Sequence, residues 1–95
     1  MNAPDHPLVA GVPDPFTGNF ASHMTFSDAP AGATIVASGL GTGEPTLVDY
    51  DLGAGHVVAL GQPVEWGFAN GEDTGLILEN GVPFAESFSP IVEIP

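Results

Sequence analysis

The sequence contains no lysine and no arginine among its 95 residues, although it has 12 aspartate and glutamate residues. Without guanidinium or ammonium side chains, it has no bidentate anchor for phosphate or carboxylate ligands. Nucleic acids and anionic membranes are bound mainly through such cations, so a formal net charge of −12 argues against both partners. Besides the N-terminal amine, only His6, His23 and His56 can carry positive charge.

Cysteine is also absent, which excludes disulfides, thiolate metal sites and a cysteine nucleophile. No apolar run approaches the roughly 18 residues that a membrane span requires. The first residues lack the basic region and the apolar region of a signal peptide. If the protein is secreted, we therefore expect its signal to lie outside this chain.

The apolar content of 43% is ample for a core and argues against disorder, and the length fits one small domain. Thirteen glycines and ten prolines divide the chain into short pieces, as in a strand-and-turn protein. We expect a single domain over residues 1–95. It would combine an extended, proline-rich segment over 1–33 with a sheet and C-terminal elements over 34–95.

The centre of the chain predicts β structure. Residues 34–37 form a short β-branched run, residues 46–52 alternate between apolar and polar side chains, and residues 56–60 are apolar again. The short glycine-containing loop after residue 52 predicts a β-hairpin over 46–60. The fold class that we expect is mainly β, a β-dominated α+β domain with a small antiparallel sheet and long Pro/Gly loops.

The segment 75–86 supports two interpretations. Asn80-Gly81 between apolar runs is a strong hairpin signal. Alternatively, one short helix near 73–86 starts at a cap close to Asp73, against which Gly81 and Pro83 count. The chain ends on apolar residues that predict a final extended strand, namely Ile91, Val92 and Ile94.

Several blocks of the sequence carry a family resemblance: HPLV at 6–9, SHMTF at 22–26, AGATIV at 31–36 and PTLVDYDLGAGHVVALGQPVEWG at 45–67. Together they resemble the C-terminal part of class I glutamine amidotransferase-like domains, closest to the non-catalytic, trehalose-utilisation type of large secreted bacterial proteins. The resemblance implies a hairpin added to a sheet, a following helix over 73–86 and an extracellular location. The cysteine nucleophile and the His-x-Glu pair of the amidotransferases have no counterpart, because Val57 and Val58 follow His56.

A catalytic set can be assembled from Ser22, His23 and either Asp28 or Asp14. No Gly-x-Ser-x-Gly elbow frames Ser22, and adjacent residues of an extended segment point to opposite faces. We therefore predict no catalytic residue and no enzymatic activity.

Calcium binding has more support, because hard cations take several oxygen ligands and some of the carboxylates lie close together or in glycine-rich turns. No EF-hand loop is present, and a solvated acidic face is the alternative interpretation. The candidate ligands are Glu44, Asp49, Asp51, Glu72 and Asp73. The aromatic residues Tyr50, Trp66 and Phe68 are either a sugar-stacking platform or part of the core.

We conclude from the sequence that the chain is a non-catalytic extracellular structural or interaction module without a required cofactor. Its partner would be a protein, either a different one or another copy in a homo-oligomer or fibre, reached by strand pairing through Ile91, Val92 and Ile94. The alternative is a Ca²⁺-dependent binding module for a sugar or a protein partner.

Overall fold

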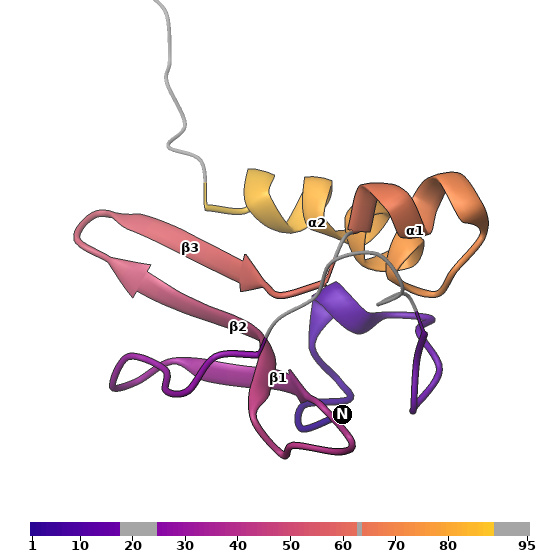
Figure 1. Cartoon of the computed structure of the whole chain (residues 1–95). Coiled ribbons are helices and arrows are strands. Elements are labelled where there is room, and N and C mark those ends of the chain that lie inside the picture. The colour runs from indigo at the N-terminus through magenta and orange to yellow at the C-terminus, as the bar shows by residue number, and fades with distance from the viewer. Residues whose placement is uncertain (18–24, 63, 89–95) are drawn as a thin grey trace, which may run out of the picture.

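A computed structural model describes residues 1–17, 25–62 and 64–88, and Figure 1 shows the arrangement of its elements. The chain forms a small α+β domain with a three-stranded antiparallel sheet, which confirms the predicted fold class. Its elements in order are η1 (Pro7–Val9), β1 (Thr34–Ser38), β2 (Pro45–Leu52), β3 (Gly55–Leu60), α1 (Val64–Asn70) and α2 (Thr74–Glu86).

The hairpin of β2 and β3 is the predicted one. The strands pair without irregularity from Leu47 opposite Leu60 to Leu52 opposite Gly55. Gly53 begins the two-residue loop with φ of 58°, a conformation that L side chains rarely adopt. The glycine and the alternating pattern of the strands therefore fix the register together.

Strand β1 pairs with the other side of β2, which makes β2 the central strand. The register shifts between Ile35 and Ala37, where Val36 is the extra residue of an irregular pair. Both Val36 and Ala37 are almost completely buried, so two consecutive side chains of β1 contribute to the core.

The core lies between the sheet, the short helix η1 and α2. In Figure 1, α2 runs alongside β3, and η1 lies between the helices and the strands β1 and β2. The buried residues of this cluster are Leu8, Val9, Val36, Ala37, Leu47 and Ile77. Side chains from all three parts of the described chain thus share one core.

The segment 73–86 is helical, so the hairpin that Asn80-Gly81 suggests does not form. The side-chain amide of Asn80 instead donates hydrogen bonds to the carbonyl oxygens of Leu8 (3.0 Å) and Ala10 (2.9 Å). Asn80 therefore attaches α2 to η1. Local sequence signals could not reveal this role, because the partners are about 70 residues away in the chain.

Helix α1, where we expected no regular element, packs closely against α2 through glycines. A Cβ atom at Gly75 would lie 2.8 Å from the Cα atom of Phe68, closer than real Cβ atoms come. A Cβ atom at Gly67 would overlap the side chain of Thr74. Both glycines thus serve the close approach of two helices, although glycine lowers the propensity of each helix.

Some sequence predictions fall outside the described residues, namely Ser22, His23 and the terminal strand at 91–95. The proline-rich segment 1–33 contains the 3-10 helix η1, which we did not predict, and Phe16 of this segment packs against the core. Within the described ranges, no helix has the length and apolar character needed to cross a membrane.

Candidate functional site

A chain of imidazole and carboxylate groups connects η1 with β2 and β3, and we call it the His–Asp network (His6, Asp49, Asp51 and His56). Asp49 and Asp51 lie on one face of β2, and His56 on β3 is directly opposite Asp51. The Nδ1 atom of His56 is 2.8 Å from Oδ1 of Asp51, and its Nε2 atom is 2.9 Å from Oδ1 of Asp49. One imidazole therefore bridges two carboxylates of the neighbouring strand.

His6 reaches the same carboxylate from the start of η1. Its Nδ1 atom accepts a hydrogen bond from the backbone N–H of Leu8, which caps η1. The Nε2 atom must then carry the ring proton, and it lies 2.5 Å from Oδ2 of Asp49. Asp49 thus accepts one hydrogen bond on each oxygen, from two histidines that are far apart in the sequence.

Two phenylalanines of the α2 region cover the network. The ring of Phe88 is stacked on His56, with a centroid distance of 3.8 Å and an angle of 2° between the ring planes. Phe84 contacts both imidazoles, at 5.1 Å from His6 and 5.8 Å from His56. The His6, His56 and Asp49 side chains are consequently about nine-tenths buried, whereas Asp51 is exposed.

The electrostatics of the network favour a charged His56. The hydrogen bond to Asp51, followed by the hydrogen bond and the charge of Asp49, raises the pKa of His56 above its ordinary value of 6.5, although burial acts in the opposite direction. Both ring nitrogens face carboxylate oxygens, so only the imidazolium form can donate to both. The carboxylates of this lysine-free and arginine-free chain are thus partly compensated by one histidine.

All four ring nitrogens of His6 and His56 are engaged within the network or in the cap of η1. A general base or a metal ligand needs a nitrogen that is free to meet its substrate or ion. In the ranges that the structure describes, no three histidine, aspartate and glutamate residues are arranged to hold a metal ion. We therefore interpret the network as a device that joins η1, β2, β3 and α2.

The candidate calcium ligands occupy three separate places. Asp49 and Asp51 belong to the His–Asp network, whereas Glu44 accepts a hydrogen bond from the hydroxyl of Thr25 at 2.9 Å. Glu72 and Asp73 lie together before α2. Calcium binding stays a prediction, because the structure places these five carboxylates as two pairs and one separate residue, Glu44.

Glu72 and Asp73 both bind Thr17 of the N-terminal segment. The Thr17 hydroxyl is 2.6 Å from Oε2 of Glu72 and 3.1 Å from Oδ2 of Asp73, which also accepts the Thr17 N–H at 2.9 Å. Asp73 precedes α2 as predicted but makes no side-chain cap bond to the helix. Its carboxylate instead accepts hydrogen bonds from Thr17 and so connects the N-terminal segment to the start of α2.

The remaining candidates from the sequence do not form one group in the described part of the chain. Asp14 binds the N-terminal amine at 3.2 Å, and Asp28 accepts the N–H of Ala29 within a local turn. Tyr50 lies on β2 and Phe68 on α1, where Phe68 is exposed. The side chain of Trp66 lies outside the described part of the structure.

Sequence patterns did not predict an apolar groove of about 540 Å³ between β3 and α2. We call it the β3–α2 groove. Its strand side consists of Val58 and Leu60, and its helix side includes Leu78, Val82 and Ala85. The nearly continuous apolar sequence of β3 could have predicted this groove. A strand with apolar side chains on both faces needs another part of the protein, or a partner, to cover each face.

The free edge of β3 borders this groove. The N–H of Gly61 donates to the carbonyl of Thr46, so the hydrogen-bonded pairs of the ladder continue with Ala59 and Val57. The backbone groups of the alternate residues, including Val58 and Leu60, consequently point away from β2. Among the described strands, β3 has β2 as its single neighbour.

The chain has a similarity to a longer bacterial protein. Over 94 aligned residues it is 31% identical to an uncharacterized protein of Clostridium acetobutylicum, and the alignment covers 93% of this chain. The same alignment covers 10% of that protein, so the chain spans about one-tenth of the length of its curated relative. No protein-family model and no solved structure matches the chain.

Proposed function

We propose that the chain is a non-catalytic interaction module of an extracellular protein, and that it associates with another copy by strand addition. The observation that carries the proposal is the edge of β3 beside the β3–α2 groove, with which no other strand of the described residues pairs. The edge offers backbone hydrogen bonds and the groove offers apolar contacts, the two components by which an added strand binds.

The strand that would be added is the C-terminal segment of a second copy. Of its apolar residues Ile91, Val92 and Ile94, the last two share one face of a strand, so the groove can bury both of these side chains. A peptide without basic residues also avoids competing salt bridges, so apolar contact and backbone pairing would set its register.

A modular role agrees with the similarity to one-tenth of a longer protein. If a longer protein held two copies of the module, each copy would meet the other at high effective concentration, and weak strand pairing would be sufficient for association. The engaged ring nitrogens of the His–Asp network support the non-catalytic part of the proposal.

Deletion of residues 91–95 and the substitution Val82→Glu test the two halves of the contact. Val82 lies on α2, is 62% exposed and lines the groove, so glutamate there adds a charge without burial inside the monomer. Leu52→Glu is the matched control, because Leu52 is 66% exposed and lies on the other face of the sheet.

We expect a concentration-dependent sedimentation coefficient for the unmodified protein and for Leu52→Glu, and a monomer for the deletion and for Val82→Glu. An unmodified protein that remains monomeric at all concentrations would contradict association. If it associates and the deletion associates equally well, strand addition through the C-terminal segment is wrong.

A further inference from the structure

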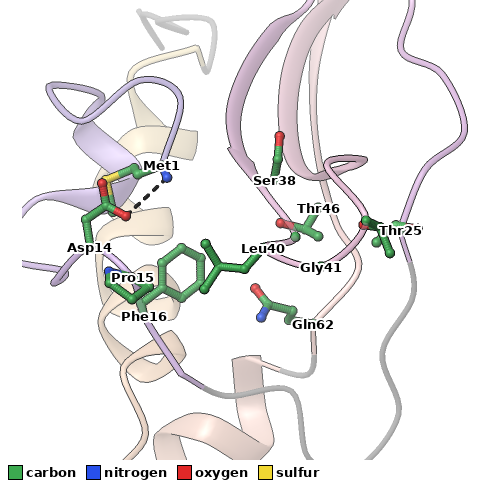
Figure 2. Close-up of a pocket in the computed structure, with 12 residues that line it drawn as sticks. Met1, Asp14, Pro15, Phe16, Thr25, Ser38, Leu40, Gly41, Thr46 and Gln62 are labelled. Atoms are coloured by element: carbon green, nitrogen blue, oxygen red, sulfur yellow. Dashed lines mark hydrogen bonds and ion pairs between the residues drawn. The ribbon is translucent and has the colours of Figure 1, made fainter.

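A second cavity, distinct from the β3–α2 groove, opens between the N-terminal segment and the loop that joins β1 to β2 (Figure 2). Its volume is about 310 Å³. Asp14 and Phe16 line one side, whereas Ser38, Leu40, Thr46 and Gln62 line the other. We call it the Gln62 cavity.

Gln62 presents an unused acceptor at this cavity. Its Oε1 atom is buried and has no hydrogen-bond partner within the described residues. Removing an amide oxygen from water without giving it a donor is costly, and folded proteins contain few such groups. A ligand that carries an O–H or N–H group would satisfy this oxygen, so the acceptor points to a ligand with donors.

The other polar groups of the wall favour hydroxyl groups on the ligand. The Ser38 hydroxyl donates to Oδ1 of Asn2 at 2.7 Å, so its own oxygen remains able to accept. Thr46, which is 7% exposed, adds a second hydroxyl to the same wall. Hydroxyl groups can both donate and accept, and they therefore match a mixed set of hydroxyl and amide groups.

Two apolar side chains of the cavity favour a ligand that also has an apolar face. Phe16 and Leu40 point toward one another in Figure 2, and Leu40 is 84% exposed. A ligand between them would cover apolar surface that now faces solvent. The cavity thus suits a ligand with donors at its rim and an apolar face toward the phenyl ring.

The charges around the cavity favour a neutral ligand over an anion or a cation. The chain has no lysine or arginine, and the N-terminal amine at this cavity is paired with Asp14 at 3.2 Å. The net charge of −12 repels anionic ligands. A cationic ligand would need a free carboxylate, but Asp14, the carboxylate that lines the cavity, is already paired with the N-terminal amine. The volume is at the lower end of small-molecule sites, which begin at about 300 Å³.

We propose that the Gln62 cavity binds one neutral sugar residue, with a ring hydroxyl donating to Oε1 of Gln62 and the ring carbons against Phe16. This inference uses none of the residues that form the β3–α2 groove. It therefore stands or falls separately from self-association.

NMR titration with D-glucose, D-galactose, D-mannose and N-acetyl-D-glucosamine tests the proposal. Gln62 is the single glutamine of the chain, so its side-chain amide is an unambiguous reporter within the cavity. We expect a saturable shift of this amide and of the Leu40 methyl groups with at least one sugar. Choline, a cation of similar size, should leave them unchanged.

The variant Gln62→Leu separates a ligand-binding role from a structural one. We expect its affinity for the responding sugar to fall by roughly tenfold or more, because one donor of the sugar loses its acceptor. Its Tm should rise by several degrees, because a buried oxygen without a donor is replaced by an apolar group.

Three results would overturn the inference. The absence of a saturable shift with all four sugars would exclude neutral monosaccharides, and a response to choline alone would assign the cavity to a cation. A lower Tm of Gln62→Leu together with unchanged sugar binding would show that Oε1 of Gln62 serves the fold.

Discussion

The ring of His56 lies flat on the ring of Phe88, with their centroids 3.8 Å apart, while both nitrogens of the same imidazole face carboxylates of β2. An imidazolium benefits from both arrangements, since an aromatic face attracts a cation and the carboxylates accept its two protons. The stack also joins the end of α2 to the sheet. His56 therefore links its own protonation to the packing of the helix that forms one wall of the β3–α2 groove.

This linkage predicts that stability falls as pH rises. The pKa of His56 is raised in the folded protein, so the folded state binds this proton more tightly than the unfolded state. The stabilisation is fully present below pH 6.5, the ordinary value, and is lost as pH rises through the folded-state pKa. Thermal unfolding between about pH 6 and about pH 9 should show a decreasing Tm over a range in which carboxylates do not titrate.

The variant His56→Gln is the control for that measurement. It retains an amide donor but cannot carry charge, so we expect a lower Tm at pH 6 and a flatter pH profile than in the unmodified protein. Equal slopes in the two proteins would assign the pH dependence to another group and contradict the role of His56.

The two carboxylates of the network should differ strongly in their effect on stability. Asp49 is 10% exposed and accepts from two histidines, so Asp49→Asn should destabilise the fold by roughly 3 kcal/mol. Asp51 is 84% exposed, and Asp51→Asn should cost about 1 kcal/mol or less. Urea unfolding at pH 6 compares the two, and similar losses would show that Asp49 is not the centre of the network.

The sequence predicted the sheet but not the network, for a physical reason. Strands and the Gly53 loop follow from local patterns of period two and turn chemistry, and these agree with the structure. The period of two places Asp49 and Asp51 on one strand face, but His6, which binds Asp49, is 43 residues from it and meets it only in the folded chain. Spacing alone cannot show such a contact.

In the two helices, local sequence signals argued against the structure that forms. Asn80-Gly81 has the local chemistry of a turn, and Gly67 and Gly75 lower helix propensity. Tertiary packing overrides both signals, because the glycines allow α1 and α2 to approach and Asn80 binds two carbonyls of the η1 region. The local residues left the hairpin and the helix both open for the segment 75–86, and the helix is the alternative that forms.

Glycine substitutions in the helices test this explanation. Gly67→Ala places a methyl group against the side chain of Thr74, so we expect a loss of roughly 1–3 kcal/mol from overpacking. Gly81→Ala is the matched control, because a Cβ atom there meets nothing within 4 Å. The control should gain about 0.4–1 kcal/mol from the reduced entropy of the unfolded chain. Equal effects of the two substitutions in urea unfolding would contradict close packing at Gly67.

Salt should stabilise the domain. With 12 carboxylates and no lysine or arginine, the charges of the folded state repel one another, and the Debye length falls to about 10 Å at 0.1 M salt. The Tm should therefore rise from about 10 mM to about 150 mM NaCl. A flat response would indicate that a bound cation already neutralises the carboxylates, and a larger response to Ca²⁺ than to Mg²⁺ would revive the calcium interpretation.

Strand addition to the β3 edge is tested most directly by the molar mass in solution, measured by light scattering at moderate salt with and without residues 91–95. The account predicts particles larger than the 9.6 kDa monomer for the full chain and a monomer after the deletion. A full chain that stays at 9.6 kDa, or assemblies that survive the deletion unchanged, would contradict it.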